Sequence, residues 1–208
     1  MPKHEKQVNR DVYEGGRYEH AGRWASYYYQ IKNILQTAPE NVLEIGPGSG
    51  VTSWFLKSQG FKVVTMDIAE DLRPDVVADI TEMPFQNDAF DTVSCCEVLE
   101  HLPFEDSVKA LTEIKRVAKN YAVISIPDHR RVLLSLAIKL PFFQEKYFII
   151  RVPSLKKHVF NGLHYWEIGH IGYPLSKIRN TLRGVGFTIE KDFTIPENPL
   201  VHFFILKK

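Results

Sequence analysis

The chain has 208 residues, of which 44% are hydrophobic and 25% charged, as in a folded globular protein and unlike a disordered, collagen-like or coiled-coil chain. Its 26 basic side chains balance 25 acidic ones, so the net charge gives no reason to expect nucleic acid as a partner. The two cysteines, Cys95 and Cys96, are adjacent. Neighbours on a strand point to opposite faces and cannot join two parts of the fold, which favours the reducing cytoplasm.

No stretch approaches the ~18 consecutive apolar residues of a membrane span, and the polar N-terminus lacks the apolar core of a signal peptide. We therefore expect a soluble, cytoplasmic protein.

The first two thirds of the chain alternate between short apolar runs and segments with helical spacing of apolar residues. In chain order, we expect a helix at 23–38, a strand at 41–45, a helix at 51–59, strands at 61–66, 75–78 and 90–95, a helix at 107–119 and a strand at 121–126. This alternation predicts an α/β fold with a mostly parallel sheet and helices on both faces.

After Pro127 the alternation stops. Residues 128–172 contain many aromatic and basic residues and no clear strand. A helix at 174–183 and strands at 187–195 and 200–206 follow, and the short link between the two strands predicts an antiparallel hairpin at the sheet edge. Charge is also uneven: residues 64–106 hold twelve acidic residues and one arginine, whereas residues 130–163 hold seven basic residues and one glutamate.

A glycine-rich turn follows the first strand, in the order Glu44-Ile45-Gly46-Pro47-Gly48-Ser49-Gly50. Glycines let a ligand approach the backbone, and the N–H groups of the helix that follows favour an anionic group. The spacing is G-x-G-x-G with Val51 next, so the dinucleotide pattern G-x-G-x-x-G is not met. Glu44 would repel a pyrophosphate and suits a ligand that carries a positive charge.

Two more carboxylates stand at strand ends. Asp67 closes the second strand, where it can accept hydrogen bonds from both ribose hydroxyls, and Asp79 follows the third. One ligand with an ammonium group, a diol and an adenine explains Glu44, Asp67 and Asp79 together. Helix capping or solvation is the competing interpretation for each carboxylate alone.

These motifs, in this order over residues 41–127, resemble the class I S-adenosylmethionine (SAM)-dependent methyltransferases, specifically the methyltransferase type 11 family. The resemblance implies a Rossmann-like, seven-stranded, mostly parallel sheet with the last strand antiparallel. It also implies a transferase that takes methyl from SAM and releases S-adenosylhomocysteine.

The resemblance further implies that nine residues bind the cofactor: Glu44, Gly46, Gly48, Asp67, Ile68, Asp79, Ile80, Cys96 and Glu97. Glu44 would lie near the ammonium of the methionine part, and Asp67 would hold the ribose diol. Asp79 would accept from the adenine amino group, and Glu97 or the carbonyl of Cys96 would close the methionine end.

SAM carries its own leaving group, so the protein mainly aligns the acceptor and excludes water. A general base is needed only if the acceptor must lose a proton. We take His101, Asp128 and His164 as the catalytic candidates, with Glu167 and His170 as further bases. His101 follows the fourth strand at the mouth of the expected site, although it could simply cap a helix.

The run from His164 to His170 could also be interpreted as a metal site. The spacing of its two histidines matches no standard ligand helix, and the cysteines lie elsewhere. We expect no metal.

The segment 128–172 leaves the fifth strand at the edge where ligands bind, so we expect a lid that selects the substrate. Its apolar and aromatic patches, which include Leu140 and Phe143, are flanked by Lys and Arg. That composition suits a small-molecule or lipid-like acceptor, or peripheral contact of 130–163 with an anionic membrane. Packing of both patches against the sheet is the alternative.

The whole chain, 1–208, is expected to be one methyltransferase domain. We divide it into an N-terminal cap and helix (1–40), a SAM-binding core (41–127), the lid (128–172) and a C-terminal helix with a β-hairpin (173–208). Other functions left open are a non-catalytic SAM-binding or scaffolding domain and an RNA methyltransferase, whereas Val51 and Glu44 argue against a nucleotide-dependent oxidoreductase.

Overall fold

The computed structural model of the protein describes residues 4, 6, 8–16, 18–139, 142 and 146–208. These residues form one seven-stranded sheet in the order β3-β2-β1-β4-β5-β9-β8 and a separate two-stranded ribbon, β6–β7. The strands of the large sheet are β1 (Asn41–Ile45), β2 (Lys62–Asp67), β3 (Val76–Val77), β4 (Phe90–Cys96), β5 (Ala118–Pro127), β8 (Thr188–Ile195) and β9 (Asn198–Lys207).

The sheet is parallel from β3 through β5, and β9 runs antiparallel between β5 and β8. The predicted fold class, with its reversed last strand and C-terminal hairpin, is therefore confirmed. The strand order changes direction between β1 and β4. In open α/β sheets the crevice beyond the carboxyl ends of the strands at such a point is where ligands bind.

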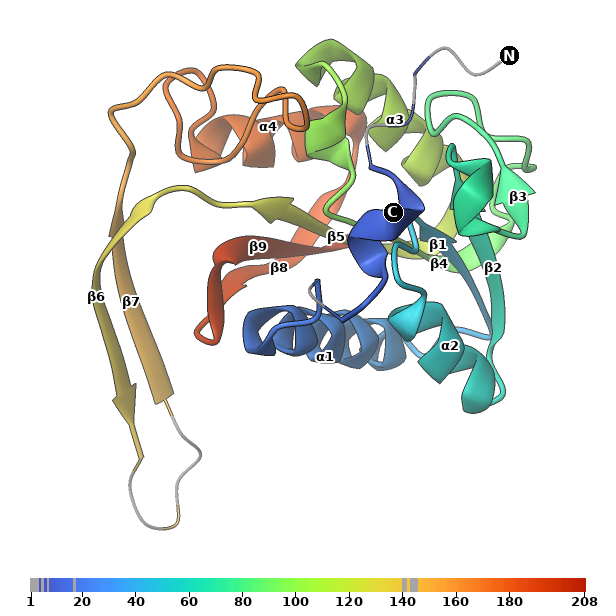
Figure 1. The fold of residues 1–208 in the computed structure, drawn as a ribbon, viewed down its shortest axis with the longest axis horizontal. Helices are drawn as coiled ribbons and strands as arrows, with labels where there is room; N and C mark the ends of the chain where they lie inside the picture. The colour runs from blue at the N-terminus through green and yellow to red at the C-terminus, as the bar shows by residue number, and fades with distance from the viewer. Residues whose placement is uncertain (1–3, 5, 7, 17, 140–141, 143–145) are drawn as a thin grey trace.

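Helices cover both faces of the sheet (Figure 1). They are α1 (Ala21–Gln36), α2 (Val51–Ser58), α3 (Phe104–Val117) and α4 (Leu175–Val185), with short 3-10 helices η1 (Arg10–Tyr13), η2 (Glu70–Leu72) and η3 (Leu99–His101). Successive side chains of a strand point to opposite faces. Val42 of β1 accordingly joins the cluster that contains Ile34 and Leu56 of α1 and α2, whereas Leu43 joins the cluster with Ile114 of α3. Each such side chain contributes about 1.5–3 kcal/mol when fully buried.

The expectation that 128–172 lacks a clear strand is wrong. β6 (Arg131–Ile138) and β7 (Lys146–Val152) pair antiparallel and form a ribbon that projects away from the body of the molecule (Figure 1). Apolar side chains are exposed on both faces of the ribbon, including the regularly paired neighbours Tyr147 and Phe148 at 41% and 55% exposure. Polar and apolar residues therefore do not alternate as they do in a half-buried strand. Leu140 and Phe143 lie outside the described residues.

None of the described helices is both long enough and apolar enough to span a bilayer.

Candidate active site

A cavity lies at the carboxyl ends of β1, β2 and β4, at the crevice that the strand order predicts. It encloses about 780 Å³ of empty space, including open solvent at its mouth. A smaller cavity adjoins it and shares Tyr13, Ile45, Gly46 and Glu97 with it. Each of the nine residues predicted to bind the cofactor lines one cavity or the other.

The glycine turn needs its glycines for conformation and for space. Gly46 has a φ of 68°, and a Cβ there would lie 2.4 Å from the side chain of Val98. Gly48 has a φ of 55°, with the ring of Tyr13 3.1 Å from the position of a Cβ. Both values lie in the left-handed region that glycine adopts without steric cost. The turn therefore exposes its backbone to the cavity.

Glu44 is buried at the base of the smaller cavity. Its Oε2 has no hydrogen-bond partner among the described residues. Burial raises the pKa of Glu44 to about 7, against hydrogen bonds from Ser53 that lower it. A buried acceptor oxygen of this kind favours a ligand that brings a cationic N–H donor, because leaving it unpaired is costly.

Asp67 lies at the end of β2 and accepts from the backbone N–H of Ala69 at 2.8 Å. Burial raises the pKa of Asp67, opposed by backbone donors from Ala69 and Ile68. Its side chain lines the larger cavity beside Ile68. The carboxylate thus faces a partly apolar wall, an arrangement that fits a ribose diol followed by a flat base.

Asp79 lies farther along the same cavity. Its Oδ1 accepts from the backbone and side chain of Thr81 at 2.9 and 2.7 Å, and its Oδ2 accepts from the backbone N of His4 at 3.2 Å. Although burial works in the opposite direction, Thr81 and the imidazole of His4, whose Nδ1 lies 2.8 Å from Oδ2, lower the pKa of Asp79 to about 2. The carboxylate is charged at neutral pH, and the N-terminal segment already lies against it.

Glu97 follows β4 with a φ of 55°, a left-handed conformation that costs a non-glycine residue about 1–3 kcal/mol and is concentrated at functional sites. The backbone N–H of Glu97 donates to the carbonyl of Ser125 at 3.0 Å, and its Oε1 accepts from the Ser125 hydroxyl at 3.1 Å. Burial raises the pKa of Glu97, and the nearby Arg23 lowers it. These contacts hold the strained turn against β5.

Sequence analysis predicted an N-terminal cap and helix over residues 1–40 but assigned no binding role to single residues of the wall that they contribute. Tyr13, Tyr18, Arg23, Tyr27 and Gln30 all line the smaller cavity. The guanidinium of Arg23 lies 4.4 Å from the ring centre of Tyr18, and its Nε is buried without a partner among the described residues. The sequence contained a signal for this wall. Polar residues such as Gln30 lie on the buried side of α1, a helix that was predicted from its apolar residues alone.

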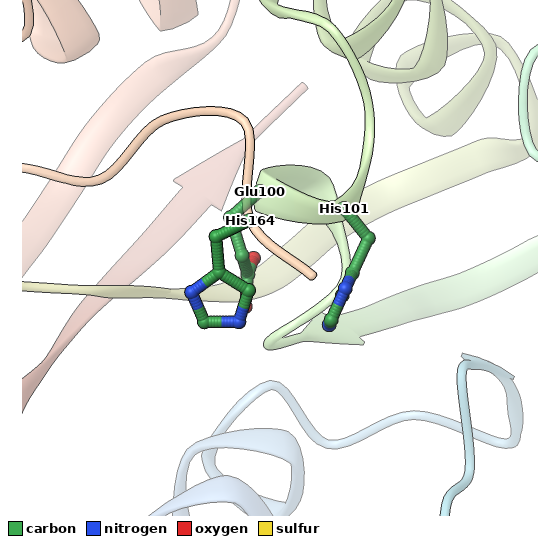
Figure 2. A group of neighbouring side chains, drawn as sticks. All are labelled: Glu100, His101 and His164. Carbon is green, nitrogen blue, oxygen red and sulfur yellow. The ribbon is translucent and has the colours of Figure 1, made fainter. Parts of the chain in front are cut away.

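Two of the three catalytic candidates, His101 and His164, come together beside the larger cavity, with Glu100 (Figure 2). The two imidazole rings lie 4.9 Å apart. Nδ1 of His101 lies 3.1 Å from the carbonyl of Leu163. Because a carbonyl only accepts, Nδ1 carries the proton and Nε2 keeps its lone pair. Burial, with the neighbouring His164, lowers the pKa of His101 to about 4, so the ring is a neutral base at physiological pH.

Glu100 was not among the predicted site residues. Its side chain is buried, and neither carboxyl oxygen has a partner in the described part of the chain. Burial and the neighbouring Glu97 raise the pKa of Glu100 far above its usual range. The group is therefore an uncharged acid next to His101 and His164.

Asp128, the third candidate, lies elsewhere. Its side chain is fully buried and pairs with Arg130 at 2.7 Å, Arg151 at 3.2 Å and His202 at 3.3 Å. These partners hold the pKa of Asp128 well below its usual range despite its burial. Asp128 lines neither cavity. The structure instead puts it in an ion-pair network at the base of the β6–β7 ribbon.

Comparison with known proteins gives the family context. Residues 43–126 match the family model described as a methyltransferase domain. An uncharacterized protein of Methanocaldococcus jannaschii is 34% identical over 86 residues, which cover 38% of this chain and 36% of that protein. The match thus spans about a third of the length of the curated relative.

Solved structures share the fold over most of the chain. The 1,6-didemethyltoxoflavin-N1-methyltransferase of Burkholderia thailandensis, crystallised with 1,6-didemethyltoxoflavin and S-adenosylhomocysteine, is 16% identical with a TM-score of 0.64, and the match covers 95% of this chain and 84% of that one. The magnesium protoporphyrin IX methyltransferase of Synechocystis, crystallised with SAM, is 16% identical with a TM-score of 0.61 and coverages of 96% and 88%. The [4+2]-cyclase SpnF is 13% identical with a TM-score of 0.61 and coverages of 91% and 84%. Residues 43–126 thus match a methyltransferase domain, and the chain shares the fold of solved SAM-dependent methyltransferases.

Proposed function

We propose that this protein transfers the methyl group of SAM to a small-molecule or lipid-like acceptor. The observation that carries the proposal is the distribution of acceptor groups along the two adjoining cavities. The unpartnered Oε2 of Glu44 lies at one end, and the carboxylates of Asp67 and Asp79 lie at the other. One ligand with an ammonium group, a ribose and an adenine would meet all three.

Other residues around Glu44 support SAM as that ligand. The methionine part of SAM also carries a carboxylate, and Arg23 provides a guanidinium with a buried, unpartnered Nε among the described residues in the same cavity as Glu44. The backbone at Gly46 and Gly48 lines this cavity, where the methionine chain would lie. Glu97 and the carbonyl of Cys96 border that end of the cavity.

In the proposed reaction, bound SAM supplies an electrophilic methyl group on its sulfonium. The protein aligns the acceptor and keeps water away from it. Nε2 of His101 would accept the acceptor's proton where the acceptor must lose one, since the imidazole is neutral and lines the cavity. His164 lies beside it and is oriented by Glu167, whose Oε1 is 2.6 Å from Nδ1 of His164.

For the acceptor we propose an apolar molecule with an anionic group, delivered by or lying in an anionic membrane surface. The β6–β7 ribbon supports this choice, since it exposes large apolar side chains near Arg131 and Lys139. Apolar surface beside basic residues is typical of proteins that contact anionic lipid. Co-sedimentation with vesicles, with and without anionic lipid, tests the membrane contact. We expect the protein to sediment only with the anionic vesicles. Failure to sediment with either kind of vesicle would contradict the proposal.

We also propose roles for the four segments. Residues 1–40 cover the cofactor, 41–127 bind it, 128–172 select the acceptor, and 173–208 complete the sheet. We place the reaction in the cytoplasm, consistent with the two free cysteines Cys95 and Cys96.

Calorimetric titration with SAM, S-adenosylhomocysteine and NAD tests the cofactor. We expect binding of SAM and S-adenosylhomocysteine and none of NAD; binding of NAD alone would refute the proposal. The cyclase SpnF shares this fold, so a second candidate is a SAM-binding protein that does not transfer methyl. A screen of acceptors with methyl-labelled SAM separates the two, because only a methyltransferase forms S-adenosylhomocysteine and labelled product together.

A further inference from the structure

A cluster of four histidines surrounds the carboxylate of Glu167, next to the sheet edge and outside the cofactor cavities. Nε2 of His129 and Nε2 of His170 each lie 3.1 Å from Oε2 of Glu167, and Nδ1 of His158 lies 3.6 Å from it. Nδ1 of His164 contacts the other oxygen, Oε1. Three imidazole nitrogens therefore converge on one buried carboxylate oxygen.

The outer nitrogens of two rings show how the inner ones are oriented. Nδ1 of His170 lies 3.1 Å from the carbonyl of Lys156, and Nε2 of His158 lies 2.8 Å from the carbonyl of His164. A carbonyl only accepts, so these outer nitrogens carry protons. In the neutral tautomer, the inner nitrogens then direct lone pairs at an oxygen that also carries lone pairs. Metal-binding histidines show this arrangement, with the outer N–H held by a carbonyl and the inner nitrogen on the ion.

The separations also fit an ion between the groups. Four ligands at about 2.0–2.2 Å around a tetrahedral Zn²⁺ lie roughly 3.3 Å from one another. The contacts of 3.1, 3.1 and 3.6 Å to Oε2 of Glu167 bracket that value. The ligand atoms of His129, Glu167 and His170 all lie within 4.8 Å of one another, whereas His158 is outside that group and reaches it through Glu167, with Nδ1 3.6 Å from Oε2.

We propose that His129, His158, Glu167 and His170 bind one divalent transition-metal ion, with Zn²⁺ the best fit. Three imidazoles and a carboxylate favour zinc over calcium or magnesium, which prefer oxygen ligands. Four protein ligands make a closed site, as in structural zinc centres. Methyl transfer from SAM needs no metal, so this ion has a different role from the proposed chemistry.

The positions of the ligands in the chain indicate that role. His129 follows β5, His158 follows β7, and Glu167 and His170 precede α4. The ion would therefore join both ends of the segment 128–172 to the edge of the sheet, at the base of the projecting ribbon. His164, which contacts Glu167 and lies beside His101, would be a second-layer residue that orients the carboxylate ligand.

Metal titration of the full chain tests the site and requires neither SAM nor an acceptor. The protein is stripped with a chelator, dialysed and titrated with Zn²⁺ by calorimetry, then with Co²⁺ while the visible spectrum is recorded. We expect one Zn²⁺ per chain, a higher Tm with zinc, and the intense visible bands of tetrahedral Co²⁺. Failure of the folded wild-type chain to bind stoichiometric Zn²⁺ would overturn the proposal.

Variants identify the ligands. H129A/H170A should lose the stoichiometric site, and H164A should weaken it by about 10–100-fold, as substitutions behind metal ligands do. H20A is the matched control, since His20 is an exposed residue that caps α1, and it should bind like the wild type. Circular dichroism of each metal-free variant establishes that it is folded. Undiminished binding by a folded H129A/H170A, or equal loss in H20A, would show that the ion binds elsewhere.

Discussion

Substitution of Glu44 by Gln tests both the burial of this carboxyl and its proposed partner. A pKa raised from 4.5 to about 7 makes ionised Glu44 about 3 kcal/mol less favourable in the folded chain than in the unfolded one, at 1.36 kcal/mol per pKa unit. Glutamine has nearly the same shape and cannot ionise. Comparison of the two proteins across pH therefore isolates the cost of this charge.

The direction of the effect follows from proton binding. Below pH 4.5, Glu44 is protonated in both states and contributes no pH dependence. Between pH 4.5 and 7 the folded chain keeps the proton while the unfolded chain releases it, so the free energy of unfolding falls as pH rises. We expect the stability of Glu44→Gln relative to wild type to increase by about 3 kcal/mol from pH 4 to pH 8 in urea unfolding. A difference that does not change with pH would refute the burial argument.

Binding of SAM should offset the cost of ionising Glu44 in the folded chain. If its ammonium pairs with ionised Glu44, binding releases a proton below pH 7, and wild-type affinity should rise by up to about tenfold per pH unit between pH 5.5 and 7. Glu97 and Asp67 also have raised pKa values in this site, so the contribution of Glu44 is the difference between wild type and Glu44→Gln. Calorimetry in buffers of different ionisation enthalpy counts the protons. Equal proton release by both proteins would refute the ammonium contact.

Other substitutions test the remaining parts of the site. Asp67→Ala should weaken SAM binding by about 1.5–3 kcal/mol, as expected for hydrogen bonds to a charged group, and Asp79→Ala should weaken it less, with native circular dichroism in both; unchanged affinity would remove the residue from the site. Asp128→Ala should lower the free energy of unfolding by about 3–5 kcal/mol, because Arg151 would stay buried without its counter-charge, and a loss below about 1 kcal/mol in urea unfolding would contradict that. Replacing 133–150 by a short glycine linker should preserve SAM binding and abolish methyl transfer, and loss of both would place the segment in the core.

The cofactor half of the site could be predicted because its residues occupy strand ends. Glu44, Asp67, Asp79 and Glu97 each follow an apolar run that is recognisable on its own. A parallel sheet brings the carboxyl ends of its strands to one edge. Local pattern and one topological rule therefore placed three of these carboxylates around the same pair of cavities, and the family resemblance added Glu97.

The remaining parts depend on contacts between distant segments, which no local pattern reveals. Arg23 reaches the cavity because α1 packs across β4, β5 and β9, and the helical periodicity of α1 indicates only which side is buried. The spacing between His164 and His170 in the sequence matches no standard metal-binding motif. In the structure, His129 and His158 also contact Glu167. The cluster therefore combines residues from three separate parts of the chain, which no local pattern indicates.

Asp128 shows how position and role can separate. Its place after β5, at the edge where ligands bind, was predicted correctly. Its role depends on Arg151 from β7 and His202 from β9. These partners pair with the carboxylate in an ion-pair network. The same long-range contacts hold the base of the ribbon. We propose that acceptor choice in this chain rests on the segment with the least local sequence signal, and the ribbon deletion is the direct way to separate it from cofactor binding.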